Sequence, residues 1–276
     1  MRDRVGAIAG QVAIHAVLTL FALMALLPFV WMFGASFKTY VEVLNSRSIF
    51  PETWSLVNYI EITDRIGFVR AFRNSATVAI PATAVVVITS TAAGYVFAKY
   101  RFPGRDLIFK LLLSTMMVPF AVALIPLFIT MKDIGMINTL HGIILTSLCS
   151  TFGIFLMRQA IETIPNDYID AARIDGAGEL WILRQVIVPL SGAAISTLAV
   201  FTFLGQWDSY IWPSIMLKSA GKQTIPIVIA GMRSLYSTRY NIWAAGSMLT
   251  VVPVMLMFSV AQKQFIGGLS MAGLKG

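Results

Sequence analysis

The sequence predicts an all-α membrane protein that crosses the bilayer six times. Hydrophobic residues make up 57% of the chain and charged residues 12%, which is about half the charged fraction of soluble domains. The apolar residues form long segments without any charge, and the charged residues gather in the stretches between them. This alternation is typical of a polytopic bundle of transmembrane helices.

Six charge-free runs locate the expected spans. Each has roughly 20 residues or more, enough to cross about 30 Å of hydrocarbon at 1.5 Å per residue. The runs do not alternate apolar and polar residues, as the strands of a membrane barrel do. The first run is too long for the apolar part of a signal peptide, so we expect a helix there. The runs are Val5–Phe37, Asn74–Ala98, Leu111–Met131, Ile134–Met157, Gln185–Trp207 and Tyr240–Gln262.

Basic residues in the short connections predict the orientation. The connection KYRFPGRDLIFK between the second and third runs carries four Lys or Arg, whereas only Lys132 and Asp133 separate the third and fourth. Short basic connections are usually cytoplasmic, which with six spans places both termini in the cytoplasm. Residues 38–73 and 208–239 then form two long outer loops, and we expect residues 1–276 to be a single transmembrane domain. The net charge of +8 is spread over both sides and does not indicate nucleic acid.

A charged stretch, about 159–189, separates the fourth and fifth runs on the predicted cytoplasmic side. Its residues predict two short helices. Asn166 is placed as the N-cap of the first, and Asp167 favours the positive end of the helix dipole. Gly176 can end this helix in a left-handed conformation.

One face of the first helix combines Ile169, Ala172 and Gly176, at the spacing i, i+3, i+7. It is small and smooth, so another backbone can approach it closely. Two interpretations fit: the stretch docks as a knob into a groove of a partner protein, or it lies on lipid headgroups with Trp181 as its anchor.

The segment DAARIDGAGELWILRQVIVP resembles the signature loop of the permeases of binding-protein-dependent ABC importers. That signature reads Glu-Ala-Ala, three residues, Gly, nine residues, Ile-x-Leu-Pro. Asp170 stands in place of its Glu and keeps the charge, and Val186 and Val188 replace its Ile and Leu. The five matching positions are Asp170, Ala171, Ala172, Gly176 and Pro189.

Shorter pieces extend the resemblance along nearly the whole chain, to the sugar-importer branch that includes the smaller maltose-type permease. The resemblance implies the type I ABC importer permease fold. The pieces are SFK at Ser36, NY at Asn58, NS at Asn74, RFPGR at Arg101, VP at Val118, IPL at Ile125, FLGQWDSYIWP at Phe203 and the closing GGLSMAGLKG.

The resemblance implies one subunit of an ATP-driven importer in a bacterial or archaeal inner membrane. Such a permease pairs with a second related permease and a dimer of ATP-binding subunits, and an extracytoplasmic solute-binding protein delivers the substrate. ATP and Mg²⁺ belong to the ATP-binding subunits, so this chain is expected to be no enzyme and to bind no cofactor. The expected contacts with the ATP-binding subunit are Asp170, Ala171, Ala172, Asp175, Gly176, Ala177 and Pro189.

Two further regions gain expected roles from the resemblance. The outer segment 214–239 corresponds to a loop that reaches into the sugar-binding protein. The tail, with Gly273, Lys275 and Gly276, resembles one that inserts between the ATP-binding subunits. A frayed terminus is the alternative for this tail.

Aromatic and polar residues gather directly after the fifth run. Aromatic faces beside hydrogen-bonding groups can hold sugar rings, so we expect a substrate path here. The alternative interpretation is an aromatic belt at the outer membrane interface with one solvated carboxylate, which has the same composition. Related permeases usually carry Asn at the position of Asp208, and in the maltose-type system most sugar contacts belong to the other permease. The residues concerned are Gln206, Trp207, Asp208, Tyr210 and Trp212.

Other kinds of chemistry lack their sequence patterns. The phosphate-binding pattern G-x-x-x-x-G-K-[ST] does not occur. His15, His141 and Cys149 are scattered, so we expect neither a metal site nor a catalytic site. Ion-coupled transporters usually carry ionisable residues within their spans, and the six runs contain no Asp, Glu, Lys or Arg. An ion-coupled transporter or channel without an ATPase partner is therefore the second hypothesis.

Overall fold

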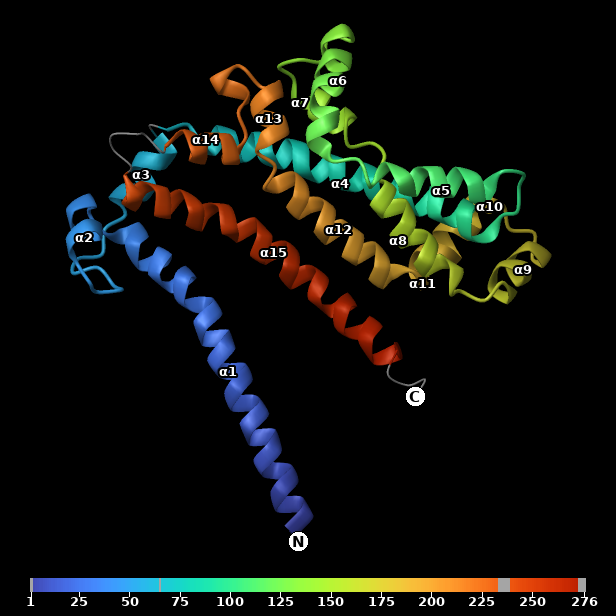
Figure 1. Cartoon of the computed structure of the whole chain (residues 1–276), viewed down its shortest axis with the longest axis horizontal. Helices are drawn as coiled ribbons and strands as arrows, with labels where there is room; N and C mark the ends of the chain where they lie inside the picture. Colours follow the sequence, from blue (N-terminus) through green and yellow to red (C-terminus); the bar gives the residue numbers. More distant parts are fainter. Residues whose placement is uncertain (1, 65, 233–238, 273–276) are drawn as a thin grey trace. The chain divides into compact units, whose positions relative to one another are not determined.

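The computed structural model describes residues 2–64, 66–232 and 239–272, which form helices and connecting segments without any strand (Figure 1). The expected all-α class is thus confirmed. Packing divides the chain into two compact units: residues 1–68 together with 229–252, and residues 69–228 together with 253–276.

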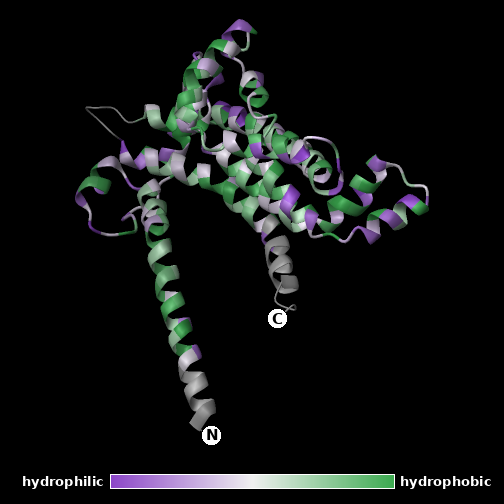
Figure 2. Ribbon diagram, turned by 45° about the vertical axis from the view of Figure 1, so that its right-hand side comes forward, coloured by the Kyte–Doolittle hydropathy of each residue, from purple (hydrophilic) through white to green (hydrophobic). Residues whose placement is uncertain are grey.

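The first unit contains α1 (Arg2–Phe37), α2 (Tyr40–Asn45), α3 (Val57–Asp64) and the first part of α15 (Tyr240–Ala272). Most of α1 is hydrophobic (Figure 2). The buried side chain of Asn58 joins these helices. Its amide donates to the carbonyl oxygens of Ser36 and Lys38, both at 2.8 Å, and its own oxygen accepts from the amide of Asn241 at 2.7 Å. The end of α1 and the start of α15 are thereby fixed to α3.

Most elements belong to the second unit. They are α4 (Phe68–Lys99), α5 (Arg105–Thr115), α6 (Phe120–Asp133), α7 (Leu140–Leu145), α8 (Thr151–Glu162), α9 (Asp167–Ile174), α10 (Glu179–Ile182), the π-helical turn η1 (Leu183–Ile187), α11 (Val188–Leu190), α12 (Gly192–Trp207), α13 (Ile211–Met216), the 3₁₀ turn η2 (Ala220–Lys222) and α14 (Ile225–Gly231).

Three helical segments of the described residues are long and apolar enough to cross a membrane: Gly10–Phe37, Phe68–Lys99 and Tyr240–Val260. Two bent pairs raise the number to five if each pair counts as one span. These are α5 with α6, bent by 99°, and Glu179–Leu190 with α12, bent by 83°. The count of six spans stays a prediction.

The expected span 111–131 is not a single helix, which corrects the prediction. α5 ends at Thr115, and Pro119 is the extended N-cap of α6, with φ −60° and ψ 135°. Proline disfavours helical backbone in the residue before it and cannot donate to the preceding turn. The apolar run therefore breaks at Pro119.

The expected span 134–157 is interrupted as well. The hydroxyl of Thr139 accepts from the N–H of Gly142 at 3.0 Å, and that of Ser150 accepts from the N–H of Gly153 at 3.1 Å. Each hydroxyl caps the start of a new helix, α7 and α8, and residues 146–150 between them are unwound. Ser and Thr inside an apolar run thus act here as caps rather than as interior helix residues.

α4 and α8 pack closely because small residues lie at their contact. A Cβ added to Gly94 would lie 2.7 Å from the Cβ of Met157, and one added to Gly153 would lie 2.3 Å from the hydroxyl of Ser90. The surrounding core extends from this contact to the elements that follow α8. Its buried members include Tyr95, Met157, Ile161, Ile164, Ile169, Ala172, Ile182, Ile187 and Leu198.

Candidate functional site

α9 and α10 form a hairpin around a left-handed glycine. Gly176 has φ 81°, and its N–H donates to the carbonyl of Arg173 at 3.0 Å. The N–H of Ala177 donates to the carbonyl of Ala172 at 2.9 Å. These two bonds form the Schellman motif, which ends a helix and turns the chain. The expected pair of short helices and the left-handed Gly176 are confirmed.

Asn166 occupies the N-cap position of α9, but its side chain does not cap the helix. Its backbone is helical, with φ −66° and ψ −24°. Its side-chain oxygen instead accepts from the ammonium of Lys99 at 3.0 Å, and the same ammonium donates to the carbonyl of Ile164. The prediction that the side chain of Asn166 caps the helix is therefore wrong. Its oxygen binds the ammonium of Lys99 instead, because a cationic donor makes a stronger hydrogen bond than a backbone N–H.

The small face of α9 points into the protein. Ile169 and Ala172 are buried in the core with α8 and α10, and Gly176 lies in the turn. Of the three residues of the predicted small face, Ile169 and Ala172 are therefore covered by the chain itself, and Gly176 is exposed. Burying an isoleucine side chain is worth about 1.5–3 kcal/mol, so this face packs on the chain itself.

The hairpin exposes large apolar side chains instead. Ile174 is 85% exposed, and Tyr168, Leu180 and Trp181 are each more than half exposed. A hollow of about 610 Å³ lies among Tyr168, Ala171, Asp175, Gly176 and Trp181. Large exposed apolar groups rimmed by charge are typical of an interaction surface.

The expected contact residues are distributed over this hairpin and the segment after it. Asp170, Ala171, Asp175 and Gly176 are exposed, and so is Pro189 in α11. Ala177 is half-buried and lines the hollow, whereas Ala172 is buried beneath it. Most of the expected set is therefore available to a partner.

Glu179 connects both arms of the hairpin to the end of α4. One carboxylate oxygen accepts from Nε and Nη2 of Arg173, at 3.1 and 2.9 Å, and the other accepts from the Tyr95 hydroxyl at 2.9 Å. Arg173 also lies over the ring of Tyr100, 5.8 Å from its centroid. Hydrogen bonds from Tyr100, Tyr95 and Arg173 lower the pKa of Glu179, and the same pairing raises the pKa of Arg173.

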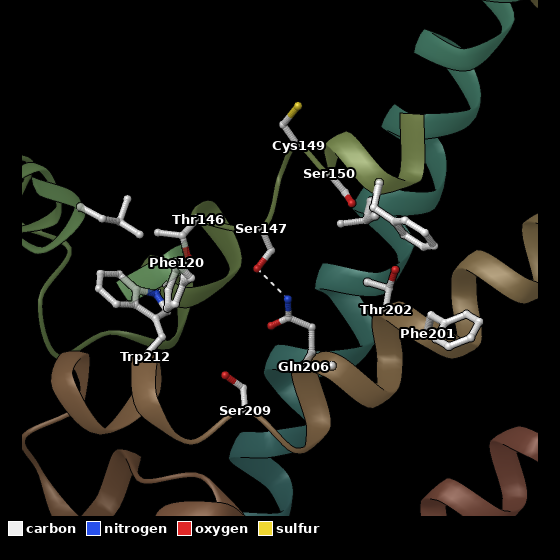
Figure 3. Close-up of a pocket in the computed structure, with 14 residues that line it drawn as sticks. Phe120, Thr146, Ser147, Cys149, Ser150, Phe201, Thr202, Gln206, Ser209 and Trp212 are labelled. Atoms are coloured by element: carbon white, nitrogen blue, oxygen red, sulfur yellow. Dashed lines mark hydrogen bonds between the residues drawn. The ribbon is translucent and has the colours of Figure 1, made fainter. Parts of the chain in front are cut away.

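The second candidate site is a pocket of about 420 Å³ at the helix breaks (Figure 3). It lies where α6 and α8 begin and where α12 ends. Its lining contains no Asp, Glu, Lys or Arg. Hydroxyl groups come from Thr146, Ser147, Ser150, Thr202 and Ser209, an amide from Gln206, a thiol from Cys149, and aromatic rings from Phe120, Phe152, Phe201 and Trp212.

Three hydrogen bonds hold the unwound segment 146–150 at this pocket. Gln206 donates to the hydroxyl of Ser147 at 2.9 Å, and the indole N–H of Trp212 donates to the hydroxyl of Thr146 at 3.0 Å (Figure 3). Thr89 of α4 donates to the carbonyl of Leu148 at 3.0 Å. Non-helical backbone at membrane depth is tolerated where it lines a cavity or is buried in protein.

Of the five residues expected on the substrate path, Gln206 and Trp212 lie at this pocket. Asp208 and Tyr210 are exposed and do not line it, whereas Ser209 between them does.

Trp207 is part of the core rather than the lining. Its ring stacks on Phe203 with centroids 5.5 Å apart, and Phe72 meets it edge-on at 5.3 Å.

The sequence reasoning missed residues 146–150, which supply most of the polar groups of the pocket besides Gln206 and Trp212. The signal was the string TSLCS inside an otherwise aliphatic run.

Residues 217–225 form a loop that is held by side chains from elsewhere in the second unit. Asn138, with φ 59°, accepts at its side-chain oxygen from the N–H groups of Lys218 and Ser219, both at 3.1 Å. Its side-chain amide donates to the hydroxyl of Ser219 at 2.8 Å, and its carbonyl accepts from Lys222 at 2.7 Å.

α4 holds the same loop from the other side. The amide of Asn74 donates to the carbonyls of Gly221 and Gln223, at 3.0 and 2.9 Å. The hydroxyl of Ser75 accepts from the N–H of Ile225 at 2.9 Å.

Two sets of residues with expected roles lie outside the described residues. They are the tail residues Gly273, Lys275 and Gly276, and positions 233–238 of the expected outer segment.

Comparison with known proteins gives consistent matches along the chain. Residues 90–264 match the family described as binding-protein-dependent transport system inner membrane component. The arabinooligosaccharides transport system permease protein AraQ of Halalkalibacterium halodurans is 34% identical over 259 residues, covering 92% of this chain and 93% of the relative. The lactose transport system permease protein LacG of Rhizobium radiobacter is 33% identical over 255 residues, with the same coverage of each chain.

Solved structures share the architecture. A chain of a bacterial ABC transporter involved in the import of the acidic polysaccharide alginate aligns with a TM-score of 0.80 and 26% identity, over 96% of this chain and 98% of that chain. A second alginate transporter chain aligns with a TM-score of 0.64 at 14% identity, over 90% and 92% of the two chains, and so shows the same fold.

Proposed function

Because the chain belongs to the family of inner membrane components of binding-protein-dependent transport systems, we propose that it forms half of the translocation path of an ATP-driven carbohydrate importer. It is a multi-pass permease subunit, and the chemistry of ATP hydrolysis belongs to a partner. The other half of the path comes from a second, related permease. A solute-binding protein delivers the substrate from outside.

The hairpin α9–α10 carries the proposal of ATP coupling. Its Schellman turn and core packing fix its shape, while Ile174 and Trp181 remain exposed at its surface. Such a surface suits docking into a groove of an ATP-binding subunit, with Asp170, Asp175 and Gly176 at the contact. Closure of the ATP-binding dimer then moves the hairpin and the helices attached to it.

The pocket at the helix breaks supports a path for uncharged sugars. Hydroxyl and amide groups beside aromatic rings provide hydrogen bonds and stacking surfaces for a sugar. A charge inside a membrane protein is costly unless it is paired, and the lining offers no charged partner. We therefore propose a neutral sugar or oligosaccharide as the substrate on this chain's side of the path.

The basic connection between α4 and α5 supports an orientation with the hairpin and both termini in the cytoplasm. Positions 214–239 then face the solute-binding protein, and the tail with Gly273, Lys275 and Gly276 contacts the ATP-binding subunits. ATP and Mg²⁺ occupy those subunits, and this chain binds neither.

Affinity purification of the tagged chain from mild detergent tests the proposal. We expect an ATP-binding subunit and a second permease to co-purify. Gly176→Pro should abolish this capture, because proline cannot adopt φ 81°. Ile174→Glu and Asp170→Lys change exposed side chains and should weaken the capture without unfolding the chain.

The matched control is Asp167→Asn, an exposed residue of α9 outside the expected contact set. It should retain the partners. Purification of the wild type alone, as a homo-oligomer that binds substrate, would overturn the proposal in favour of an ion-coupled transporter or channel. So would normal uptake by both Gly176→Pro and Asp170→Lys.

A further inference from the structure

α4 contacts two distant parts of the second unit, one at each end. Figure 1 shows it as one unbroken helix. Asn74 and Ser75 near its start hold the loop 217–225, and Tyr95 and Lys99 near its end hold the hairpin α9–α10. At 1.5 Å per residue, Asn74 and Tyr95 are about 32 Å apart along the axis, close to the hydrocarbon thickness of a bilayer.

The contacts at the hairpin involve both of its arms. Lys99 binds the carbonyl of Ile164, where α8 ends, and the side chain of Asn166, where α9 begins. Tyr95 binds Glu179, where α10 begins. Bonds to charged groups are the stronger kind of hydrogen bond. The hairpin therefore cannot rotate on its own without breaking them, and a displacement of the hairpin displaces the end of α4.

The contacts at the loop are made to main-chain atoms. Asn74 donates to two carbonyls and Ser75 accepts from one N–H, so the positions of residues 221, 223 and 225 follow that of α4. Unlike a contact between flexible side chains, a bond to the main chain moves the loop itself.

The second half of α4 is held tightly against α8 and is prevented from sliding. Gly94 contacts Met157 and Arg158 so closely that an added Cβ would lie within 3.0 Å of their atoms, and Ser90 fits against Gly153 in the same manner. Close-packed interiors are hardly compressible and transmit displacement. Among the helices that line the pocket, α4 alone continues past it on both sides, since α6 and α8 begin there and α12 ends there.

We propose that α4 is the mechanical link between the hairpin and the loop 217–225, with Tyr95, Glu179 and Asn74 as positioning residues. Movement of the hairpin on ATP binding is passed along α4 and shifts the loop on the opposite side of the membrane. This inference rests on the proposed ATP coupling, and it adds the route by which the coupling reaches the loop.

The test uses the full importer, with its second permease and ATP-binding subunits, reconstituted in nanodiscs. Cys149→Ser removes the native thiol, and Ala220→Cys places a new one on the exposed η2 turn. The rate of labelling by fluorescein maleimide is compared without nucleotide and after trapping with Mg-ATP and orthovanadate. We expect a several-fold change in this rate on trapping.

Tyr95→Phe and Asn74→Ala should each reduce the change while ATP hydrolysis and the rate without nucleotide are kept, because the bonds of Lys99 and Ser75 remain. Because the two contacts act in series, the loss of change in the double variant should be smaller than the sum of the two single losses, a non-additive result. Glu179→Gln keeps the side-chain volume and should reproduce Tyr95→Phe if that variant assembles poorly. Arg73→Gln and Asp167→Asn, exposed residues beside the two contacts, should keep the full change.

Failure of the proposed importer function and failure of the role proposed for α4 give different results. If the wild type neither hydrolyses ATP nor traps vanadate, the proposed function itself fails. If the trapped wild type shows no change in labelling, or if Tyr95→Phe and Asn74→Ala retain the whole change, the importer stands and the role of α4 is overturned.

Discussion

The side-chain amide of Gln206 lies 2.9 Å from the hydroxyl of Ser147, and this hydrogen bond joins α12 to the unwound residues 146–150. One of the two N–H groups of the amide is thereby used, and the carbonyl oxygen of Gln206 lies at the pocket, where it can accept a hydrogen bond (Figure 3). A single side chain thus fixes the wall of the pocket and presents a polar group to its contents.

Cys149 lines the same pocket and serves as a native reporter of its charge selectivity. In the assembled importer, a neutral methanethiosulfonate reagent should modify it, whereas cationic and anionic reagents should react roughly a hundredfold more slowly, relative to a free thiol, because an unpaired charge is costly inside the membrane. Gln206→Lys should accelerate the anionic reagent selectively. Cys149→Ser should abolish labelling, and equal rates for all three reagents would contradict an uncharged path.

Gly94→Ala should destabilise the protein by about 1–3 kcal/mol, the usual cost of overpacking a tight contact. The new methyl group would lie 2.7 Å from the Cβ of Met157 and 2.9 Å from the backbone nitrogen of Arg158. Thermal unfolding of the purified protein in detergent measures the effect. Gly192→Ala is the matched control, because its Cβ meets nothing within 4 Å. A Tm for Gly94→Ala as high as that of the control would show that the helices can separate freely.

Acid should loosen the hairpin through Glu179. Hydrogen bonds from Tyr100, Tyr95 and Arg173 lower its pKa in the folded protein. A carboxyl group of this kind contributes stability at pH values above its unfolded pKa and loses it as the pH falls through the lowered folded value. The protection of residues 167–182 against hydrogen exchange, corrected for the intrinsic pH dependence of exchange, should therefore begin to fall as the pH drops below the ordinary pKa of glutamate and be lowest below the depressed folded value. In Glu179→Gln the pH dependence should flatten; an unchanged profile would assign the effect to another carboxylate.

Asn58→Ala should destabilise the first unit strongly. It leaves the carbonyls of Ser36 and Lys38 without their donor in a buried place, at a cost of about 1–3 kcal/mol per group. Asn45→Ala, at the exposed end of α2, should have little effect. Denaturant unfolding in detergent compares the two. Equal midpoints for both variants would mean that Asn58 does not hold these helices together.

The sequence predicts those features that depend on local chemistry. The helical class follows from the apolar runs, and the hairpin follows from Gly176, whose left-handed backbone needs no distant partner. The helix breaks were not predicted, because a hydroxyl that caps a helix and one that lies within it look the same in an apolar run. Thr139 and Ser150 act as caps only because the chain turns at those points.

Long-range partners explain the remaining differences. Asn58 and Asn74 stand out in the sequence as parts of short motifs, but their hydrogen-bond partners Asn241 and Gly221 lie 183 and 147 positions away. The orientation of α9 also depends on distant residues. Its small face is covered by the core around α8 and α10, which no local pattern specifies.

The loop 217–225 is held by Asn74, Ser75 and Asn138, and most of these bonds end on its main-chain atoms. Apart from Ser219 and Lys222, whose side chains bond to Asn138, the exposed side chains of the loop are therefore of little consequence to its position. Substitutions of these side chains can therefore change the chemistry of the surface while Asn74, Ser75 and Asn138 keep the loop in place. Under the proposed function, such substitutions in one short segment would adapt the permease to a different delivery protein without rebuilding the bundle beneath it.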